Sequence, residues 1–183
     1  MARVIAGMTM SLDGFINDRN GDVSRLYPDM EALRETDEVQ EAMERTGAVV
    51  MGRRSYDMGD GDFTGYEFQT PIFVLTHRAP DQVAKGENDK LSFTFVTDGI
   101  ESAIAQAKAA AGDKDVTVIG GASTVQQCIN AGLVDELEID LRSVLLGDGT
   151  RLFDQLGDAP MELETSRVSE SPGVTHLRFR VAK

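Results

Sequence analysis

The sequence predicts one α/β domain over residues 1–183, built on a mostly parallel β-sheet that ends in an antiparallel hairpin. Short apolar runs alternate with segments of helical periodicity as far as residue 133, which is typical of strands joined by helices. Beyond that point, residues 134–146, 161–169 and 174–181 are all strand-like, and strands without an intervening helix tend to pair antiparallel. A chain of 183 residues with 41% hydrophobic content is long enough to bury a core.

The N-terminal part predicts two strands around one helical segment. Residues 4–10 show period-two alternation and predict a strand, followed by a turn at Asp13-Gly14. Apolar residues at helical spacing over 29–46 predict a helix, with a break near Thr36 left open. Residues 48–51 then predict a short buried strand that stops at Gly52.

The middle of the chain continues the alternation of strands and helices. Residues 53–58 predict a short helix, and a glycine-rich loop follows. Strands are expected at 72–75 and 92–97. Asp98 is expected to cap the next helix, which carries apolar residues at helical spacing and stops at Gly112.

A glycine pair at the end of an apolar run is the most informative feature of the chain. Strand-forming residues 116–119 end at Gly120 and Gly121, and a helical pattern begins directly afterwards. Ser123 and Gln126 have the spacing of a capping box, which predicts that the helix begins there. Because amides at a helix start attract anions and glycine permits close approach, a bound phosphate is expected. A tight strand–helix turn without a ligand is the alternative.

The composition excludes several classes of protein. A net charge of −13 disfavours binding to nucleic acid or to anionic membranes. No apolar run reaches the roughly 20 residues of a membrane span, and the N-terminal residues do not resemble a signal peptide. One cysteine and two histidines exclude an internal disulfide and argue against a zinc site. We therefore expect a cytoplasmic protein without a metal ion, in which Cys128 serves packing.

Three of the predicted strands end in similar polar or glycine-containing segments, at residues 52–55, 76–78 and 120–123. Ligands of open parallel sheets bind beyond the carboxyl ends of the strands. If these ends are neighbours, they form one rim with arginines, hydroxyls and backbone amides, which suits a dinucleotide with several phosphates. An ordinary solvated surface is the alternative for each arginine taken alone.

A series of motifs in chain order resembles the dihydrofolate reductase-like superfamily. Residues 49–56 (Val-Val-Met-Gly-Arg-Arg-Ser-Tyr), 73–78 (Phe-Val-Leu-Thr-His-Arg) and 118–121 (Val-Ile-Gly-Gly) are similar to segments of dihydrofolate reductase. Residues 11–16 (Ser-Leu-Asp-Gly-Phe-Ile), 132–137 and 145–149 are closer to the reductase domain of riboflavin biosynthesis proteins, the RibD C-terminal domain. This resemblance implies a dihydrofolate reductase-like three-layer fold, with helices on both faces of the sheet.

The resemblance also implies NADPH as the cofactor. The residues that it assigns to the ribose 2′-phosphate are Arg53, Arg54 and Ser55, which follow Gly52, together with Thr76, His77 and Arg78. Those that it assigns to the pyrophosphate are Gly120, Gly121, Ala122, Ser123 and Thr124, with a cis peptide between the two glycines. By the same analogy, Ala6 and Ile16 are expected near the nicotinamide.

Substrate recognition and catalysis rest on fewer residues. Asp13 matches the aspartate of the Ser-Leu-Asp-Gly motif and is the candidate catalytic group, although Asp-Gly is also a common turn. Asp29, Tyr56 and Tyr66 are the candidate substrate contacts. The chain departs from the riboflavin reductases at Ile119, where they usually have a glutamate, so the resemblance leaves the substrate open.

The working hypothesis is an NADPH-dependent reductase that transfers a hydride to a small heterocycle. The substrate is expected to be pterin-like or a riboflavin-precursor pyrimidine, as in 5-amino-6-(5-phosphoribosylamino)uracil reductase. The alternative is a catalytically silent NADPH-binding or regulatory module of the same fold. Relatives of the riboflavin type often pair, so a homodimer is expected, and His176, in the last predicted strand, is expected to be structural.

Overall fold

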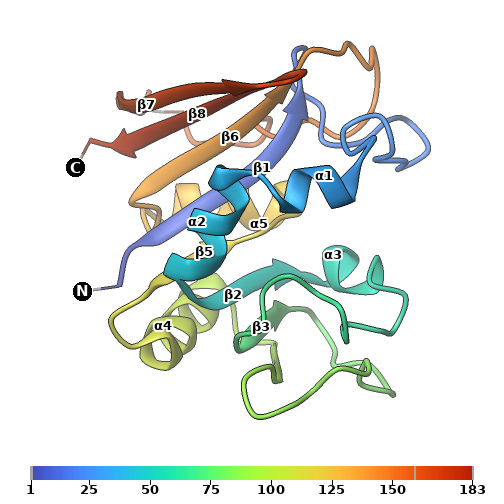
Figure 1. Cartoon of the computed structure of the whole chain (residues 1–183). Coiled ribbons are helices and arrows are strands. Elements are labelled where there is room, and N and C mark those ends of the chain that lie inside the picture. Colours follow the sequence, from blue (N-terminus) through green and yellow to red (C-terminus); the bar gives the residue numbers. More distant parts are fainter. Residues whose placement is uncertain (1, 159, 183) are drawn as a thin grey trace.

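An eight-stranded mixed sheet forms the centre of the molecule (Figure 1). The computed structural model describes residues 2–158 and 160–182. The strands are β1 (Val4–Ser11), β2 (Thr46–Gly52), β3 (Ile72–Leu75), β4 (Phe93–Val96), β5 (Asp115–Val118), β6 (Glu136–Arg142), β7 (Leu163–Ser171) and β8 (Val174–Val181). They lie in the order β4-β3-β2-β5-β1-β6-β8-β7, and only the pairs β6–β8 and β8–β7 are antiparallel. The predicted mostly parallel sheet with a C-terminal antiparallel hairpin is therefore confirmed.

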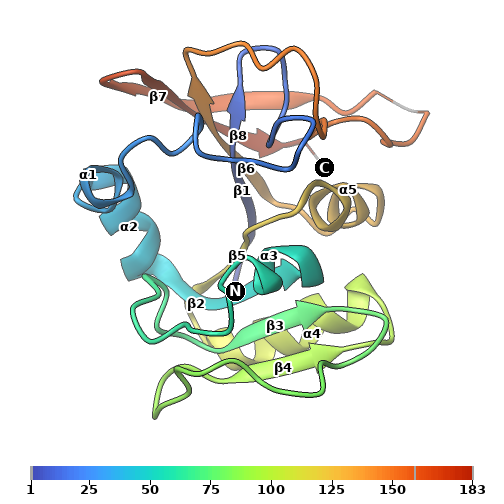
Figure 2. The same cartoon turned by 90° about the vertical axis from the view of Figure 1, so that its right-hand side faces the viewer.

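Helices cover both faces of this sheet, as the predicted three-layer fold requires (Figure 2). The helices are α1 (Met30–Arg34), α2 (Asp37–Arg45), α3 (Arg53–Asp57), α4 (Ile100–Ala111) and α5 (Ala122–Asn130). Alternation along β2 separates the layers, because successive strand residues point to opposite faces. Val50 packs in the cluster that contains α4 and α5, whereas Val49 and Met51 pack with Tyr56 of α3.

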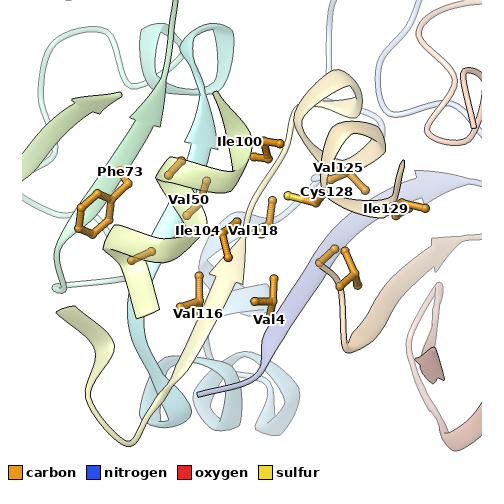
Figure 3. Close-up of a cluster of buried hydrophobic side chains, with 14 of the residues drawn as sticks. Val4, Val50, Phe73, Ile100, Ile104, Val116, Val118, Val125, Cys128 and Ile129 are labelled. Atoms are coloured by element: carbon orange, nitrogen blue, oxygen red, sulfur yellow. The ribbon is translucent and has the colours of Figure 1, made fainter. Parts of the chain in front are cut away.

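The larger core cluster lies between the sheet and helices α4 and α5 (Figure 3). Val116 and Val118 of β5 face Ile104 of α4, and all three side chains are almost fully buried. Cys128 of α5 belongs to the same cluster, and burial raises the pKa of its thiol to about 12. A thiol held in its neutral form among hydrocarbon side chains fits the packing role expected for Cys128.

Two predicted details of the helices are wrong, and a third, left open, is decided. The break considered near Thr36 is present, because Asp29 caps α1 and Thr36 caps α2 with their side chains. The capping box does not form: α5 begins at Ala122, and Gln126 instead donates to the carbonyl of Leu152 at 2.8 Å. Helix α4 is capped by Gly99 rather than Asp98.

Candidate functional site

A large open cavity lies beyond the carboxyl ends of β2, β3 and β5. Its volume is about 1620 Å³, which exceeds the roughly 300–1,000 Å³ of a typical site for a drug-sized ligand. Since β3, β2 and β5 are consecutive in the sheet, their ends meet at one edge. The cavity extends from there along β1 to α2 and the C-terminal hairpin. It therefore has room for two ligands side by side.

The first end of the cavity, which we call the rim, consists of residues 52–55, 76–78 and 121–124. All of the predicted cofactor residues in these ranges line the cavity, and so does Ile16. The resemblance assigned to them the binding of NADPH, which stays a proposal. The structure brings these three segments, which are distant in sequence, together on one surface of the cavity.

The three arginines of the rim differ in how far they are already engaged. Arg53 bridges two strand ends, since its guanidinium donates to Asp57 at 2.8 Å and to the carbonyl of Arg78 at 2.9 Å. The Arg78 side chain is exposed and pairs with Asp81 at 2.7 Å. Arg54 is exposed, and within the described ranges its guanidinium has no ion pair or hydrogen bond. Arg54 is thus the cation most available to an anionic ligand.

Glycines let a ligand approach the backbone at the rim. A Cβ on Gly52 would lie 2.6 Å from Oγ1 of Thr124, so this strand end tolerates no side chain. Gly120 has a φ of +77°, and the peptide bond between Gly120 and Gly121 is cis, as the resemblance implied. Gly121, at the start of α5, makes no side-chain cap, which leaves the helix start open to a ligand from the cavity.

The residues expected near the nicotinamide are placed differently from the prediction. Ile16 lines the cavity, but Ala6 does not: it is 1% exposed and packs in the core cluster on the opposite face of β1. Its neighbour Gly7 points the other way and lines the cavity. The Ala6 side chain therefore faces the core rather than the cavity, because neighbouring residues of a strand face opposite sides. Gly120 is also buried and does not line the cavity, whereas Gly121 does.

The second end of the cavity is closed by a network of ion pairs between α2 and the C-terminal strands, which we call the polar wall. Arg45 of α2 makes a bidentate pair with Glu138 of β6. Arg178 of β8 forms an ion pair with the same carboxylate at 2.6 Å and donates to Glu41 of α2 at 3.0 Å. Arg167 of β7 completes the network with Glu41 at 2.7 Å. Every arginine of this wall is therefore neutralised by a carboxylate.

A second polar group lies beside the wall and was missed by the sequence analysis. Nδ1 of His176 is 2.6 Å from Oδ1 of Asp140, and its Nε2 is 2.8 Å from Oγ of Ser171. The contact with Asp140 raises the pKa of His176 above its ordinary value, because a carboxylate favours the imidazolium. His176 and Asp140 both line the cavity. No sequence signal pairs two residues 36 positions apart; the β6–β8 register places them opposite each other.

The candidate substrate residues separate into one that lines the cavity and two that do not. Tyr66 lines it, and burial raises the pKa of its phenol. Tyr56 is a core residue: it is 5% exposed, stacks against Phe63, and its hydroxyl accepts from the amide of Ala84 at 2.7 Å. Asp29 uses its carboxylate to cap α1 through the amide of Ala32 at 2.9 Å and lies outside the cavity. The predictions for Tyr56 and Asp29 are therefore corrected.

Asp13, the candidate catalytic residue, also lies outside the cavity. Its carboxylate accepts from Ser11 at 2.6 Å and from the amides of Leu146 and Gly147 at 3.1 and 2.7 Å. These bonds, with the serine hydroxyl first, lower the pKa of Asp13 to about 2. A carboxylate that is this acidic and already saturated tethers two loops, so the expected role in proton delivery is corrected.

The structure also bears on the expected dimer, on membrane spans and on metal sites. Leu137 and Ile139 of β6 are buried within the chain, so they provide no dimer surface. The homodimer stays a prediction. Among the described residues, no helix has the length and apolarity to cross a bilayer, and none of the His, Cys, Asp and Glu side chains gather as a metal site would require.

Comparison with known proteins gives consistent results. The sequence profile described as "RibD C-terminal domain" matches residues 2–177. The uncharacterized protein YyaP of Bacillus subtilis is 28% identical over 158 residues, covering 82% of this chain and 80% of the relative.

Solved structures show the same fold. A protein described as a putative riboflavin biosynthesis protein, from Shewanella sp. PV-4, is 26% identical with a TM-score of 0.80, and each chain is fully covered. The riboflavin biosynthesis reductase Rib7 of Saccharomyces cerevisiae is 15% identical with a TM-score of 0.61, covering 100% of this chain and 89% of Rib7. A Thermotoga maritima deaminase/5-amino-6-(5-phosphoribosylamino)uracil reductase is 16% identical with a TM-score of 0.77. The match covers 99% of this chain and 57% of that larger protein.

Proposed function

This chain belongs to the RibD C-terminal domain family, and from that premise we propose that it is an NADPH-dependent reductase of a small heterocyclic substrate. The similarity to riboflavin biosynthesis reductases supports the reductase class. The observation that carries the choice of cofactor is the rim, where three neighbouring strand ends bring arginines, glycines and a helix start to one edge of a large cavity.

Charge supports an anionic ligand at the rim. In a chain with a net charge of −13, an anion needs a local cluster of cations to overcome the general repulsion. Arg53, Arg54 and Arg78 supply such a cluster beside the hydroxyl of Ser55. A guanidinium can hold a phosphate by two parallel hydrogen bonds, and a second arginine favours the extra 2′-phosphate of NADPH over NADH.

In the proposed mechanism, the chain contributes binding and orientation. When bound, NADPH supplies the hydride. The rim would grip its phosphates, while Gly7 and Ile16 would lie beside the nicotinamide. The rest of the cavity, toward Tyr66 and the polar wall, would hold the substrate so that its C=N or C=O carbon faces the hydride donor. A pterin-like ring or a riboflavin-precursor pyrimidine is the proposed substrate class.

A catalytically silent NADPH-binding module is the second candidate. Two observations favour it: Asp13 is engaged in tethering loops, and Ile119 occupies the position before the glycine pair. The two candidates predict the same cofactor affinity and opposite results in a turnover assay. Oxidation of NADPH at 340 nm against pterin, aminopyrimidine and simple carbonyl substrates distinguishes them.

Calorimetric titration with NADPH and NADH tests the cofactor assignment. We expect the wild type to prefer NADPH, and Arg54→Ala to weaken NADPH binding by about 10- to 100-fold, the worth of one or two charged hydrogen bonds. The affinity for NADH should change much less. The matched control is Arg180→Ala, which removes an exposed arginine outside the cavity. Equal affinity for both nucleotides in wild type and Arg54→Ala would contradict the assignment.

A further inference from the structure

Two of the carboxylates that line the far end of the cavity are held by arginines, and a third, Glu38, accepts from the hydroxyl of Ser169 at 2.9 Å. Glu138 is held by Arg45 and Arg178, and Glu67 is held by Arg34 at 3.4 Å. Asp140 is different, because within the described ranges its ion-pair partner is a histidine and no arginine or lysine. An aspartate paired with a histidine can exchange a proton near neutral pH, whereas a carboxylate paired with arginine cannot.

The geometry of the pair places the carboxylate toward the cavity and the ring behind it. The side chain of Asp140 is 33% exposed and that of His176 is 7% exposed. Oδ1 of Asp140 faces the ring at 2.6 Å, and Ser171 occupies the other ring nitrogen at 2.8 Å. Oδ2 of Asp140 has no hydrogen-bond partner among residues 2–158 and 160–182, which leaves one carboxylate oxygen for a ligand.

The pair also lies close to the place proposed for the nicotinamide. Asp140 is in register with Thr9 on the neighbouring strand β1, and Thr9 lies two residues beyond Gly7. At about 3.3 Å per residue, this separation is roughly 7 Å, which is enough for one flat ring between the two positions. Tyr27, which hydrogen-bonds with Thr9, lines the same part of the cavity.

We propose that Asp140 and His176 form the proton relay of the reductase, with Asp140 as the group that touches the substrate and Ser171 as a positioning residue for the ring. This inference rests on the proposed function, and it supplies the proton donor that the reaction needs. Hydride transfer from NADPH leaves a negative charge on the substrate nitrogen or oxygen. The O–H bond of the protonated Asp140 breaks and its proton goes to that atom, while the electron pair stays on the carboxylate.

The relay delivers one proton to the substrate in each turnover. The states His176-H⁺/Asp140⁻ and His176/Asp140-H contain the same number of protons, so the ring can store the proton that the carboxylate delivers. After delivery the pair is neutral imidazole and carboxylate, and water recharges it once the product has left. NADPH is the reductant in this scheme, and no further oxidant or reductant is required.

Charges on the surrounding elements set the pH range of the relay. Asp140 on β6 and Glu38 on α2 favour the imidazolium, whereas Arg167 on β7 opposes it. Their net effect raises the pKa of His176, so the protonated pair is present at low pH and is lost as pH rises through this raised value. The turnover number of the wild type should therefore fall on the alkaline side.

Steady-state kinetics of His176→Gln and Asp140→Asn across pH test the relay, with Glu170→Gln as the matched control on the exposed side of the same hairpin. We expect each relay variant to lose about 100-fold in kcat, the usual worth of a general acid, with unchanged affinity for NADPH. In His176→Gln the alkaline limb that the imidazole sets should disappear, because the ring that stores the proton is absent. Ser171→Ala should move the wild-type limb slightly to lower pH, because the ring loses a hydrogen-bond partner.

Three results would overturn the relay. Wild-type kcat and pH profile in folded Asp140→Asn would remove Asp140 as the donor, even if His176→Gln fails to fold. A loss of NADPH affinity that accounts for the whole defect would assign the pair to cofactor binding. A wild-type protein that binds NADPH but reduces no substrate overturns the proposed reductase, and the relay with it. Histidine NMR provides a separate check, since the chain has only His77 and His176: Asp140→Asn should lower the pKa of His176.

Discussion

The two ends of the cavity differ in whether an arginine is left unpaired. At the rim, Arg53 and Arg78 pair with Asp57 and Asp81, whereas Arg54 is exposed and has no partner among the described residues. At the polar wall, Arg45 is 14% exposed and pairs with Glu138, which is 21% exposed and also held by Arg178. The rim therefore keeps a positive charge for a ligand, whereas the wall uses its positive charges to join α2 to the C-terminal strands.

This difference has a consequence for the substrate. A phosphate group gains most from cations that are not already neutralised. Since the arginines of the wall are engaged with Glu138 and Glu41, the far end of the cavity presents hydroxyls, a phenol and carboxylates to a ligand. Of the two proposed substrates, an unphosphorylated pterin-like ring therefore fits this end better than a phosphorylated riboflavin precursor.

The largest effect should come from breaking the polar wall. Arg45→Met leaves Glu138 with one partner in a half-buried site, so we expect a loss of about 3 kcal/mol in the free energy of unfolding, the lower end of the range for broken buried pairs. Urea denaturation measures this loss. The matched comparison is Arg54→Ala at the rim, which should change stability by no more than about 0.5 kcal/mol. If Arg45→Met is as stable as the wild type but loses ligand binding, the comparison of the two ends fails.

A smaller effect should come from the residue that anchors α3 behind the rim. Tyr56→Phe removes the acceptor of the Ala84 amide, and a buried unsatisfied amide costs about 1–3 kcal/mol. We expect this loss in urea unfolding, together with nearly wild-type affinity for NADPH. Tyr66→Phe is the control, because its ring lines the cavity and its hydroxyl has no hydrogen bond within the described ranges. Tyr66→Phe should affect substrate KM more than stability. If Tyr56→Phe instead raised substrate KM and left stability unchanged, Tyr56 would be restored as a substrate contact.

The smallest effect concerns salt. Exposed charges are screened over about 10 Å at 0.1 M salt, whereas buried pairs are screened much less. The affinity for NADPH should therefore fall several-fold between about 0.05 and 0.5 M salt, and the slope should be shallower in Arg54→Ala. A slope that is the same in both proteins would indicate that Arg54 does not face the bound anion.

The sequence predicted elements and strand ends better than it predicted individual side chains. Gly52, Thr76 and Gly121 were correctly expected at the ends of strands, because glycines and polar residues interrupt apolar runs there. Asp13 and Tyr56 were misassigned, since a motif match does not reveal that a carboxylate is saturated by backbone amides or that a phenol is buried. The motif match also did not reveal that the Ala6 side chain faces the core, because neighbouring residues of a strand face opposite sides.

By itself, the sequence determined the α/β class, the parallel order of strands and helices, the hairpin and the position of the glycine pair, because these follow from local periodicity and turn chemistry. Only the tertiary structure decided which charges remain available. The pairing of Asp140 with His176, and of Arg45 with Glu138, joins residues 36 and 93 positions apart. Such contacts depend on strand register and helix docking, which are set by residues throughout the chain and not by any one segment.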